Sequence, residues 1–218
     1  MSLSLPSTSP ASLRADLQAR IHLMQGKRGS ERSLPVLPSL SRLLPGGLRP
    51  GAVYSVQGSM SLAMALLAGP SRDGGWCGVA GISDFGIEAA AGFGIALDRL
   101  VLVPEPGAKW TQVIATMAEV LSVVLASAPE KIAPAEAARL GARLRERNAV
   151  LLVLGQWPQS EAVLQASGYE WAGLGKGHGH FAKQELEIEV ALRGSSRKAS
   201  VDLSGDGTVE LSSHRLGA

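Results

Sequence analysis

The hydrophobic positions of the chain fall into short continuous runs separated by segments with helical spacing. Four runs of five or six residues are each followed by Gly or Pro within two residues, and each is predicted to be a strand: 52–56, 76–80, 99–103 and 149–154. The fourth run has no polar alternation, which is typical of a strand buried on both faces of a parallel sheet. The pattern therefore predicts a central sheet of buried strands.

Segments with helical spacing lie between these runs and predict four core helices: 59–67, 86–97, 109–128 and 134–148. The last of them opens with a proline in its first turn, where proline is favoured. A short helix is also expected at 39–44, in a stretch interrupted by Pro and Gly. Strands that alternate with helices indicate an α/β fold with a mostly parallel central sheet flanked by helices.

The two ends of the chain differ from this core. Residues 12–25 place apolar side chains on one stripe and charged ones opposite, which predicts an amphipathic N-terminal helix, followed by a Gly- and Ser-containing linker. Beyond Gly168, runs at 186–192, 199–203 and 208–211 are joined by turn residues. These runs predict antiparallel strands that extend the sheet at its C-terminal end.

Composition narrows the class of protein. The chain has 218 residues, of which 45% are hydrophobic and 18% charged, so one domain with a substantial core is expected and wholesale disorder is excluded. The single cysteine, Cys77, excludes a disulfide framework and a Cys-based zinc cluster, and we expect it to be a small buried hydrophobe. No apolar run reaches the length of a membrane span, and the N-terminus lacks a secretion signal. A soluble cytoplasmic protein is therefore expected.

The net charge of +2 is small, but basic groups gather near the N-terminus, where residues 1–50 hold seven basic groups against two acidic ones. Such an excess can attract a phosphate backbone or an acidic partner surface. Scattered charges of this kind are also common on an ordinary solvated face. Both interpretations stay open from the sequence.

The segment from Gly47 to Leu67 has the layout of a phosphate-binding loop, with a turn, a short strand, a glycine and then a helix. A working loop has the pattern G-x-x-x-x-G-K-[ST], in which the Lys neutralises phosphate oxygens and the hydroxyl binds magnesium. Counting from Gly58, this chain has Ala63, Met64 and Ala65 in the last three of these positions. The loop is therefore degenerate, since none of these side chains can do that chemistry.

A second nucleotide signature is an acidic residue at the end of a neighbouring strand, where it would hold the magnesium. The predicted strand at 149–154 ends in Leu154 and Gly155, without Asp or Glu. Both signatures are absent together, so we expect no bound cofactor and no catalytic residues. No set of metal ligands is evident in the sequence either.

A Gly-rich stretch near the C-terminal strands contains four basic or imidazole side chains, and we consider it a weak candidate for DNA binding: Lys176, His178, His180 and Lys183. A flexible basic loop of this kind can order on a phosphate backbone. The two histidines could also bind a metal, but a third ligand is not evident. An ordinary surface loop is the remaining interpretation.

Two terminal features are weak candidates for binding partners. The apolar stripe of the N-terminal helix needs a surface to cover it, from its own core, a second copy or another protein. Its members are Leu13, Leu17, Ile21 and Met24. The C-terminal strand and tail could offer an open sheet edge to a partner strand through Val209, Leu211 and Arg215. Trp157, which precedes a proline, is either a core residue or part of an interface.

Four segments in this order resemble the core of RecA-type recombinases. They are LPSLSRLLPGGLRPGAVYSVQG, CGVAGISDFGIEAAAGFGIALDRLVLVPEP, AVLLVLGQ and FAKQELEIEVALRG. The resemblance spans residues 38–204 and is greatest to the ImuA branch, to which the SulA cell-division inhibitors are related. It implies a RecA-like core with antiparallel C-terminal strands. We therefore divide the chain into an N-terminal helix and linker (1–33), a core without an intact nucleotide site (34–204) and a C-terminal strand and tail (205–218).

The ImuA resemblance implies a catalytically inert protein of the DNA-damage (SOS) response. It would assist an ImuB-type relative of Y-family polymerases, and through it an error-prone C-family polymerase, in mutagenic translesion synthesis by the mutasome. The resemblance also places the Gly-rich stretch like RecA's second DNA-binding loop and the N-terminal helix like the arm that joins RecA subunits. It thus implies contact with single-stranded or damaged DNA and self-association as further expectations.

Two other functions stay open. One is a SulA-like inhibitor that acts on the tubulin-like division protein, although such inhibitors are typically shorter than this chain. The other is an enzyme with a rearranged nucleotide site. The catalytic Glu of RecA would fall near Ser83 or Asp84, so such an enzyme would have to use Asp84 or Glu88.

Overall fold

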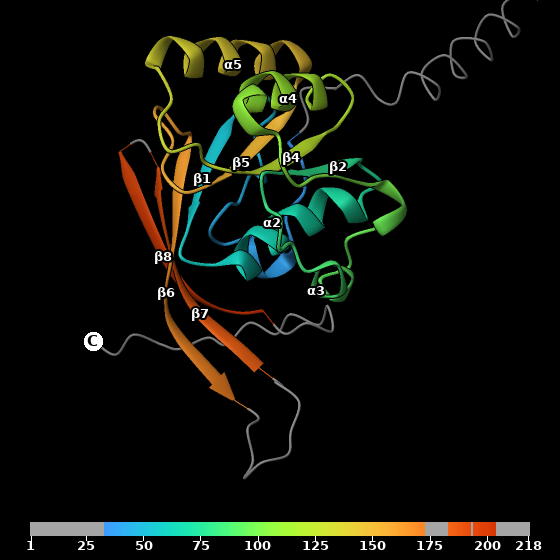
Figure 1. Ribbon diagram of the computed structural model, residues 1–218. Coiled ribbons are helices and arrows are strands. Elements are labelled where there is room, and N and C mark those ends of the chain that lie inside the picture. Colours follow the sequence, from blue (N-terminus) through green and yellow to red (C-terminus); the bar gives the residue numbers. More distant parts are fainter. Residues whose placement is uncertain (1–32, 173–182, 193, 204–218) are drawn as a thin grey trace, which may run out of the picture. The chain divides into compact units, whose positions relative to one another are not determined.

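The computed structural model describes residues 33–172, 183–192 and 194–203 (Figure 1). Within these ranges, no helix is both long and apolar enough to cross a membrane. The helix expected at 12–25 and the strand expected at 208–211 lie outside the described residues.

The described residues form one eight-stranded sheet in the order β3-β2-β4-β5-β1-β6-β7-β8. The first six strands in this order run parallel, and β7 and β8 are antiparallel to their neighbours. The strands are β1 (Val53–Gln57), β2 (Cys77–Ala80), β3 (Leu100–Val103), β4 (Val123–Ser127), β5 (Val150–Leu154), β6 (Ala162–Ala172), β7 (Lys183–Leu192) and β8 (Ser195–Asp202). The expected class, α/β with a mostly parallel sheet and antiparallel C-terminal strands, is confirmed at this level.

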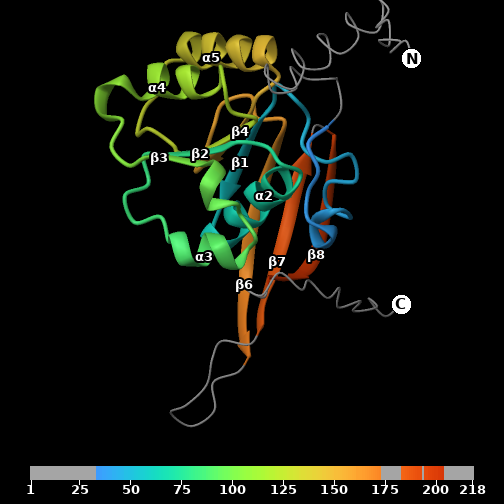
Figure 2. The ribbon, with the colours of Figure 1, turned by 90° about the vertical axis from the view of Figure 1, so that its right-hand side faces the viewer.

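Helices cover the two faces of the sheet differently (Figures 1 and 2). One face packs against η1, α2 and α3 in a core that reaches every strand from β2 to β8. In the described part of the chain, the other face packs against α4 and α5 in a core that reaches β1 to β5 but not β6, β7 or β8. The helices are η1 (Pro38–Leu40), α2 (Met60–Arg72), α3 (Ile87–Gly92), η2 (Leu97–Arg99), η3 (Gly107–Lys109), α4 (Trp110–Met117) and α5 (Pro134–Arg147).

The sequence of α5 explains its ends and its packing. Pro134 occupies the first turn, and Asn148 ends the helix in the left-handed conformation that a C-cap requires. The side chains of Ala137, Leu140 and Leu144 recur at helical spacing and are buried against the sheet. The prediction of this helix is confirmed.

The helix expected at 109–128 is wrong in its second half. The structure has α4 over the first part, a turn, and then β4 as a buried strand between β2 and β5. The segment lacks a Gly or Pro that would mark the boundary, and its continuous apolar run fits a helix and a buried strand equally. The paired valines Val123 and Val124 are the β-branched signal for the strand.

Most other expected elements are present but differ in length, and one strand was missed. Strand β6 was not expected, because Gln165, Ser167 and Gly168 interrupt its apolar pattern. The helix expected at 86–97 ends at Gly92, and the one expected at 59–67 continues to Arg72. The short helix expected at 39–44 is the 3-10 turn η1. The strands expected at 52–56, 76–80, 99–103, 149–154, 186–192 and 199–203 are confirmed, with boundaries that shift by a few residues.

On the α4/α5 side of the sheet, no helix of the described residues covers strands β6, β7 and β8. On this side Glu187, Glu189 and Lys198 are exposed, whereas the alternate residues Ile188 and Val190 are buried in the opposite core. Lys198 Nζ lies 2.8 Å from a carboxylate oxygen of Glu187, and Ser196 donates a 2.8 Å hydrogen bond to Glu189. This alternation of polar and apolar residues is typical of antiparallel strands with one solvated face.

Two glycines in helices allow a matched test of packing. A Cβ at Gly69 of α2 would lie 2.3 Å from the carbonyl oxygen of Pro35, whereas a Cβ at Gly141 of α5 would meet only Arg145 Nη1, at 3.4 Å. Gly69→Ala should therefore lower the free energy of unfolding by about 1–3 kcal/mol, because rigid backbone must move. Gly141→Ala should raise it by about 0.5–1 kcal/mol, because alanine is the better helix former.

Urea denaturation of the two variants and the wild-type chain measures this difference. Both variants add one methyl group to a helix, so a general effect of the added methyl would move them in the same direction. Equal shifts in the two variants would contradict the packing around Gly69.

Candidate functional site

The carboxyl ends of parallel strands are the usual ligand-binding edge of an α/β sheet. At this edge β1 leads into α2 through only two residues, Gly58 and Ser59. Gly58 has a positive φ of 83°, and a Cβ there would lie 2.5 Å from the carbonyl oxygen of Ala166 on β6. The turn is therefore tight and packed against the neighbouring strand.

Helix α2 begins where a phosphate-binding loop would lie. Ser59 is its N-cap, and the Ser59 Oγ accepts a 3.1 Å hydrogen bond from the backbone N–H of Leu62. The degenerate positions Ala63, Met64 and Ala65 fall in the first two turns of this helix and are buried in the core. The strand, turn and helix expected from the sequence are present, but helix replaces the loop between them.

The neighbouring strand ends carry no acidic residue. Leu154 and Gly155 end β5 and begin the next connection, and the Gly155 N–H donates to the carbonyl of Val56 on β1. On the next strand, β4, the end is formed by Ser127, followed by Ala128. Among the described residues, no group of three or more His, Cys, Asp or Glu side chains could hold a metal ion.

The alternative acidic candidates lie on the surface. Ser83 and Asp84 are exposed in the turn after β2, and Glu88 is exposed in the first turn of α3. Among the described residues, neither Asp84 nor Glu88 forms a hydrogen bond or ion pair with a basic side chain or with the other.

The other sequence candidates fall largely outside the description. Lys176, His178 and His180 belong to the connection between β6 and β7, which is not described, and Lys183 is placed only by its backbone at the start of β7. The two strands that bear this connection form an antiparallel hairpin that continues past β1, since β6 pairs with β1 only up to Gln165 (Figure 1). The remaining candidates, Leu13, Leu17, Ile21, Met24, Val209, Leu211 and Arg215, also lie outside the described residues.

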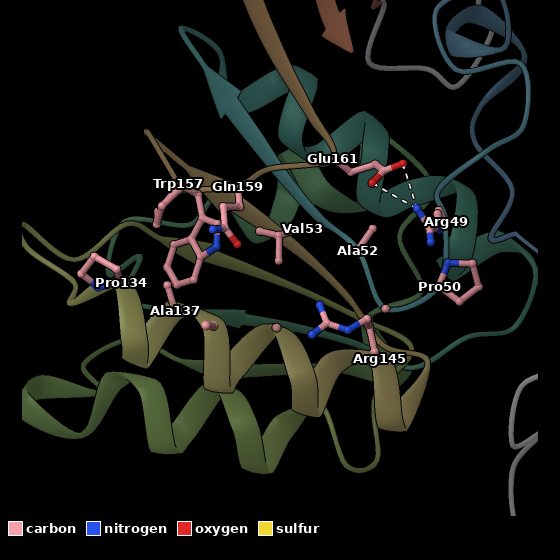
Figure 3. A pocket seen from close by; sticks show the side chains of 14 residues that line it. Arg49, Pro50, Ala52, Val53, Pro134, Ala137, Arg145, Trp157, Gln159 and Glu161 are labelled. Atoms are coloured by element: carbon pink, nitrogen blue, oxygen red, sulfur yellow. Dashed lines mark hydrogen bonds and ion pairs between the residues drawn. The ribbon is translucent and has the colours of Figure 1, made fainter. Parts of the chain in front are cut away.

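The structure instead contains a groove that the sequence did not predict (Figure 3). It lies between α5, the start of β1 and the connection from β5 to β6, and its cavity volume is about 280 Å³. Its floor consists mainly of small residues, which are Gly51, Ala52, Val53, Ala137, Ala138 and Gly141. A Cβ at Gly51 would lie 2.7 Å from the Cα of Arg145, so glycine permits this close approach of α5 to β1.

A hydrogen-bond network fixes the wall of the groove. Ser55, buried on β1, accepts a 3.1 Å hydrogen bond from the backbone N–H of Trp157, and its Oγ lies 2.6 Å from the Oγ of Ser160. Ser160 in turn donates to the carbonyl oxygen of Trp157. The indole of Trp157 packs against Trp110, with ring centroids 5.7 Å apart. The wall is therefore rigid, and Trp157 is both a core residue and a groove residue.

The charged groups of the groove lie near the start of β1. Nη1 of Arg49 donates to both carboxylate oxygens of Glu161, at 3.2 and 3.3 Å. The Arg49 backbone N–H donates to the hydroxyl of Tyr54, and burial raises the pKa of that phenol. Arg145 extends from α5 into the groove (Figure 3), and its guanidinium forms no hydrogen bond or ion pair with a described residue. Within the described residues, the groove thus contains one arginine paired with a carboxylate and one without such a partner.

The sequence offered little signal for this groove. Arg49, Arg145 and Glu161 are far apart in the chain, and neither their spacing nor their residue types form a motif. The one partial signal was Trp157 followed by Pro158, which suggested either a core residue or an interface.

These features define the class of protein: an α/β protein with a mostly parallel sheet, in which a two-residue turn leads from β1 directly into α2. The chain belongs to the family of the MT3502 N-terminal domain, whose model matches residues 42–159. This range contains β1 to β5 and α2 to α5, and it ends in the connection that lines the groove.

A relative in Mycobacterium tuberculosis (strain ATCC 25618 / H37Rv) is named "Uncharacterized protein Rv3395c". The two sequences are 33% identical over 135 residues, which cover 59% of this chain and 66% of the relative. The chain therefore spans just under two thirds of the length of that relative.

The single cysteine provides a test of the core beneath α2. Burial raises the pKa of the Cys77 thiol to about 12. At pH 8.5 this lowers the thiolate fraction on the order of 1,000-fold relative to an exposed cysteine. The native chain should therefore react with a disulfide reagent only at the rate of unfolding, and the same chain in concentrated urea should react at once. Rapid stoichiometric labelling of the native chain would contradict the burial of this thiol.

The same thiol contributes to the pH dependence of stability. Above about pH 9 the unfolded chain loses the proton of Cys77, whereas the folded chain keeps it up to about pH 12. The unfolded state then binds fewer protons, so this thiol lowers the free energy of unfolding as pH rises through that window.

Because a capped helix with apolar side chains follows Gly58, we expect no nucleotide to bind at this edge of the sheet. Calorimetric titration of the full chain with magnesium and ATP should give no saturable heat, since a positive side chain and a free loop are both missing there. Saturable binding that is lost in Asp84→Asn or Glu88→Gln would favour the rearranged enzyme site instead. Binding that survives both variants would place a nucleotide elsewhere on the chain.

Proposed function

We propose that this protein is a catalytically inert RecA-like accessory protein of SOS-induced translesion DNA synthesis. In this role it binds an ImuB-type relative of Y-family polymerases and holds it in an assembly with an error-prone C-family polymerase. Its mechanism is assembly, so its own residues bind and position partners and transfer no chemical group.

The observation that carries this proposal is the start of α2 two residues after β1. An ATP-driven recombinase needs a loop of free backbone N–H groups, a lysine and a magnesium ligand at this place. This chain has a capped helix there, and its residues Ala63, Met64 and Ala65 are buried in the core. Such an arrangement supports a protein that acts through its surfaces rather than through nucleotide hydrolysis.

The architecture supports the RecA-like part of the proposal. A mostly parallel sheet with helices on both faces and antiparallel strands at the C-terminal end is what the resemblance implies. The hairpin of β6 and β7 carries the Gly-rich stretch for which DNA contact is predicted. Contact with DNA and self-association stay part of the proposal on these grounds.

The alternative is a SulA-like inhibitor of the tubulin-like division protein. It shares the inert core, so the geometry of α2 does not distinguish it from the adaptor. The two proposals name different partners, and the test below therefore measures both.

The test is co-elution of the purified full chain with an ImuB-type protein on size exclusion with light scattering. A complex heavier than either component is expected, and its mass gives the stoichiometry. The tubulin-like division protein is run in parallel, and a Y-family polymerase that is not of the ImuB type is the matched control.

Each outcome of this test distinguishes the two functions. Binding to the ImuB-type protein alone supports the adaptor. Binding to the division protein alone overturns it in favour of division inhibition. Equal binding to the control polymerase, or no complex with any of the three, contradicts the adaptor as proposed.

A further inference from the structure

The groove along α5 has the chemistry of a peptide-binding site. One end holds the indole of Trp157, the ring of Pro134 and the amide of Gln159, and small side chains line the groove along α5 and the start of β1 (Figure 3). The other end carries Arg49, Arg145 and Glu161. An apolar cleft with a few convergent polar groups is the usual form of a binding site.

Arg145 gives the groove a net positive charge. The carboxylate of Glu161 is already engaged by Arg49, so this pair contributes little net charge. The guanidinium of Arg145 lies over Gly141, one turn earlier in α5, since a Cβ there would be 3.4 Å from its Nη1. It points into the groove and has no anionic partner among the described residues, so the groove presents one positive charge to an occupant.

The size of the groove limits what can occupy it. A cavity of about 280 Å³ is at the small end of ligand pockets. Its volume is too small to hold a whole turn of an α-helix, whose diameter with side chains is about 10–12 Å, so an occupant inserts single side chains. One unpaired cation is also too few for a phosphate backbone, whose binding depends on several contacts with lysine or arginine. An extended chain that inserts one or two side chains fits these limits.

Charge complementarity favours an acidic occupant over a basic one, because the guanidinium of Arg145 faces the groove. Residues 1–32, with five basic and two acidic groups, match this charge poorly.

We propose that this groove binds an extended acidic segment of a partner protein, with a carboxylate on Arg145 and a small apolar side chain between Trp157 and the floor of α5. The pair formed by Arg49 and Glu161 then borders the segment and disfavours a second acidic residue beside Glu161. This inference does not rest on the proposed role in translesion synthesis, because it follows from the charge and shape of the groove.

The test uses fluorescein-labelled decapeptides in which Asp or Glu alternates with Ala, Val or Leu. Their binding to the full chain is measured by fluorescence anisotropy, beside matched peptides with Asn or Gln in place of the acids. Acidic peptides should bind at least tenfold more tightly than their neutral matches, and the difference should shrink as salt is raised.

Two charge reversals on the same helix provide the matched variants. Arg145→Glu should weaken binding of the acidic peptides at least tenfold. Arg147→Glu makes the same change at an exposed residue of α5 that does not line the groove. The affinity of this variant for the acidic peptides should stay within about twofold of the wild-type value. A third variant, Ala138→Leu, narrows the groove from an exposed position and should weaken acidic and neutral peptides alike. Far-UV circular dichroism and the urea midpoint of each variant establish that it is folded.

Four results would overturn the proposal. The first is that no acidic peptide binds with a Kd below roughly 1 mM, and the second is that acidic and neutral peptides bind equally. The third is that Arg145→Glu and Arg147→Glu weaken binding equally, and the fourth is that Ala138→Leu binds with full affinity. Binding of a short single-stranded oligonucleotide that depends on Arg145, without peptide binding, would assign the groove to nucleic acid. Light scattering that shows self-association dependent on Arg145 would assign it to a second copy.

Discussion

The buried hydroxyl of Ser55 fixes the connection that takes the chain across β1, from β5 on one side to β6 on the other. It lies at the centre of the sheet, where an unpartnered polar group would be costly, and its partners come from the connection between β5 and β6. The seven residues between Leu154 and Ala162 join β5 to β6, which lie on opposite sides of β1, and this connection contains no helix. Because no helix crosses there, β6 lies beside β1 with one face left open.

The unequal covering of the two faces follows from this crossing. On the side of α2 the core continues under every strand up to β8, through residues such as Ile188 and Val201. On the side of α5 the helices stop above β1, so β7 and β8 carry glutamates, serines and Lys198 that pair across the strands. The edge of α5 then faces the wall built on Ser55, and the groove is the space between them.

The sequence predicted the parts of this fold that local patterns determine. The all-apolar run of β5 and the capped helix α5 were clear, because burial on both faces and Pro or Asn at helix ends leave a direct signal. The boundary between α4 and β4 was not, since no turn residue separates them and the same apolar run suits either element. The spacing predicted that Ala63, Met64 and Ala65 stand in phosphate-loop positions, but that they belong to a buried helix was visible only in the structure. The groove could not be predicted, because Arg49, Arg145 and Glu161 meet through the sheet order alone.

The closed carboxyl edge has a physical consequence for how this chain can act. A helix cap and a phosphate compete for the same backbone N–H groups, and here Ser59 already satisfies that of Leu62. A lysine in place of Met64 would carry its charge in the core, where the cost of desolvating it is several kcal/mol. Point substitutions therefore cannot create a phosphate loop here, since Met60 to Ala63 are helical and would first have to unwind. Because the backbone groups at this edge are used by the helix, a ligand of the described part of the chain is expected on its outer surfaces. Among these surfaces, the groove beside Arg145 combines a fixed wall, small apolar residues and a guanidinium without a described partner.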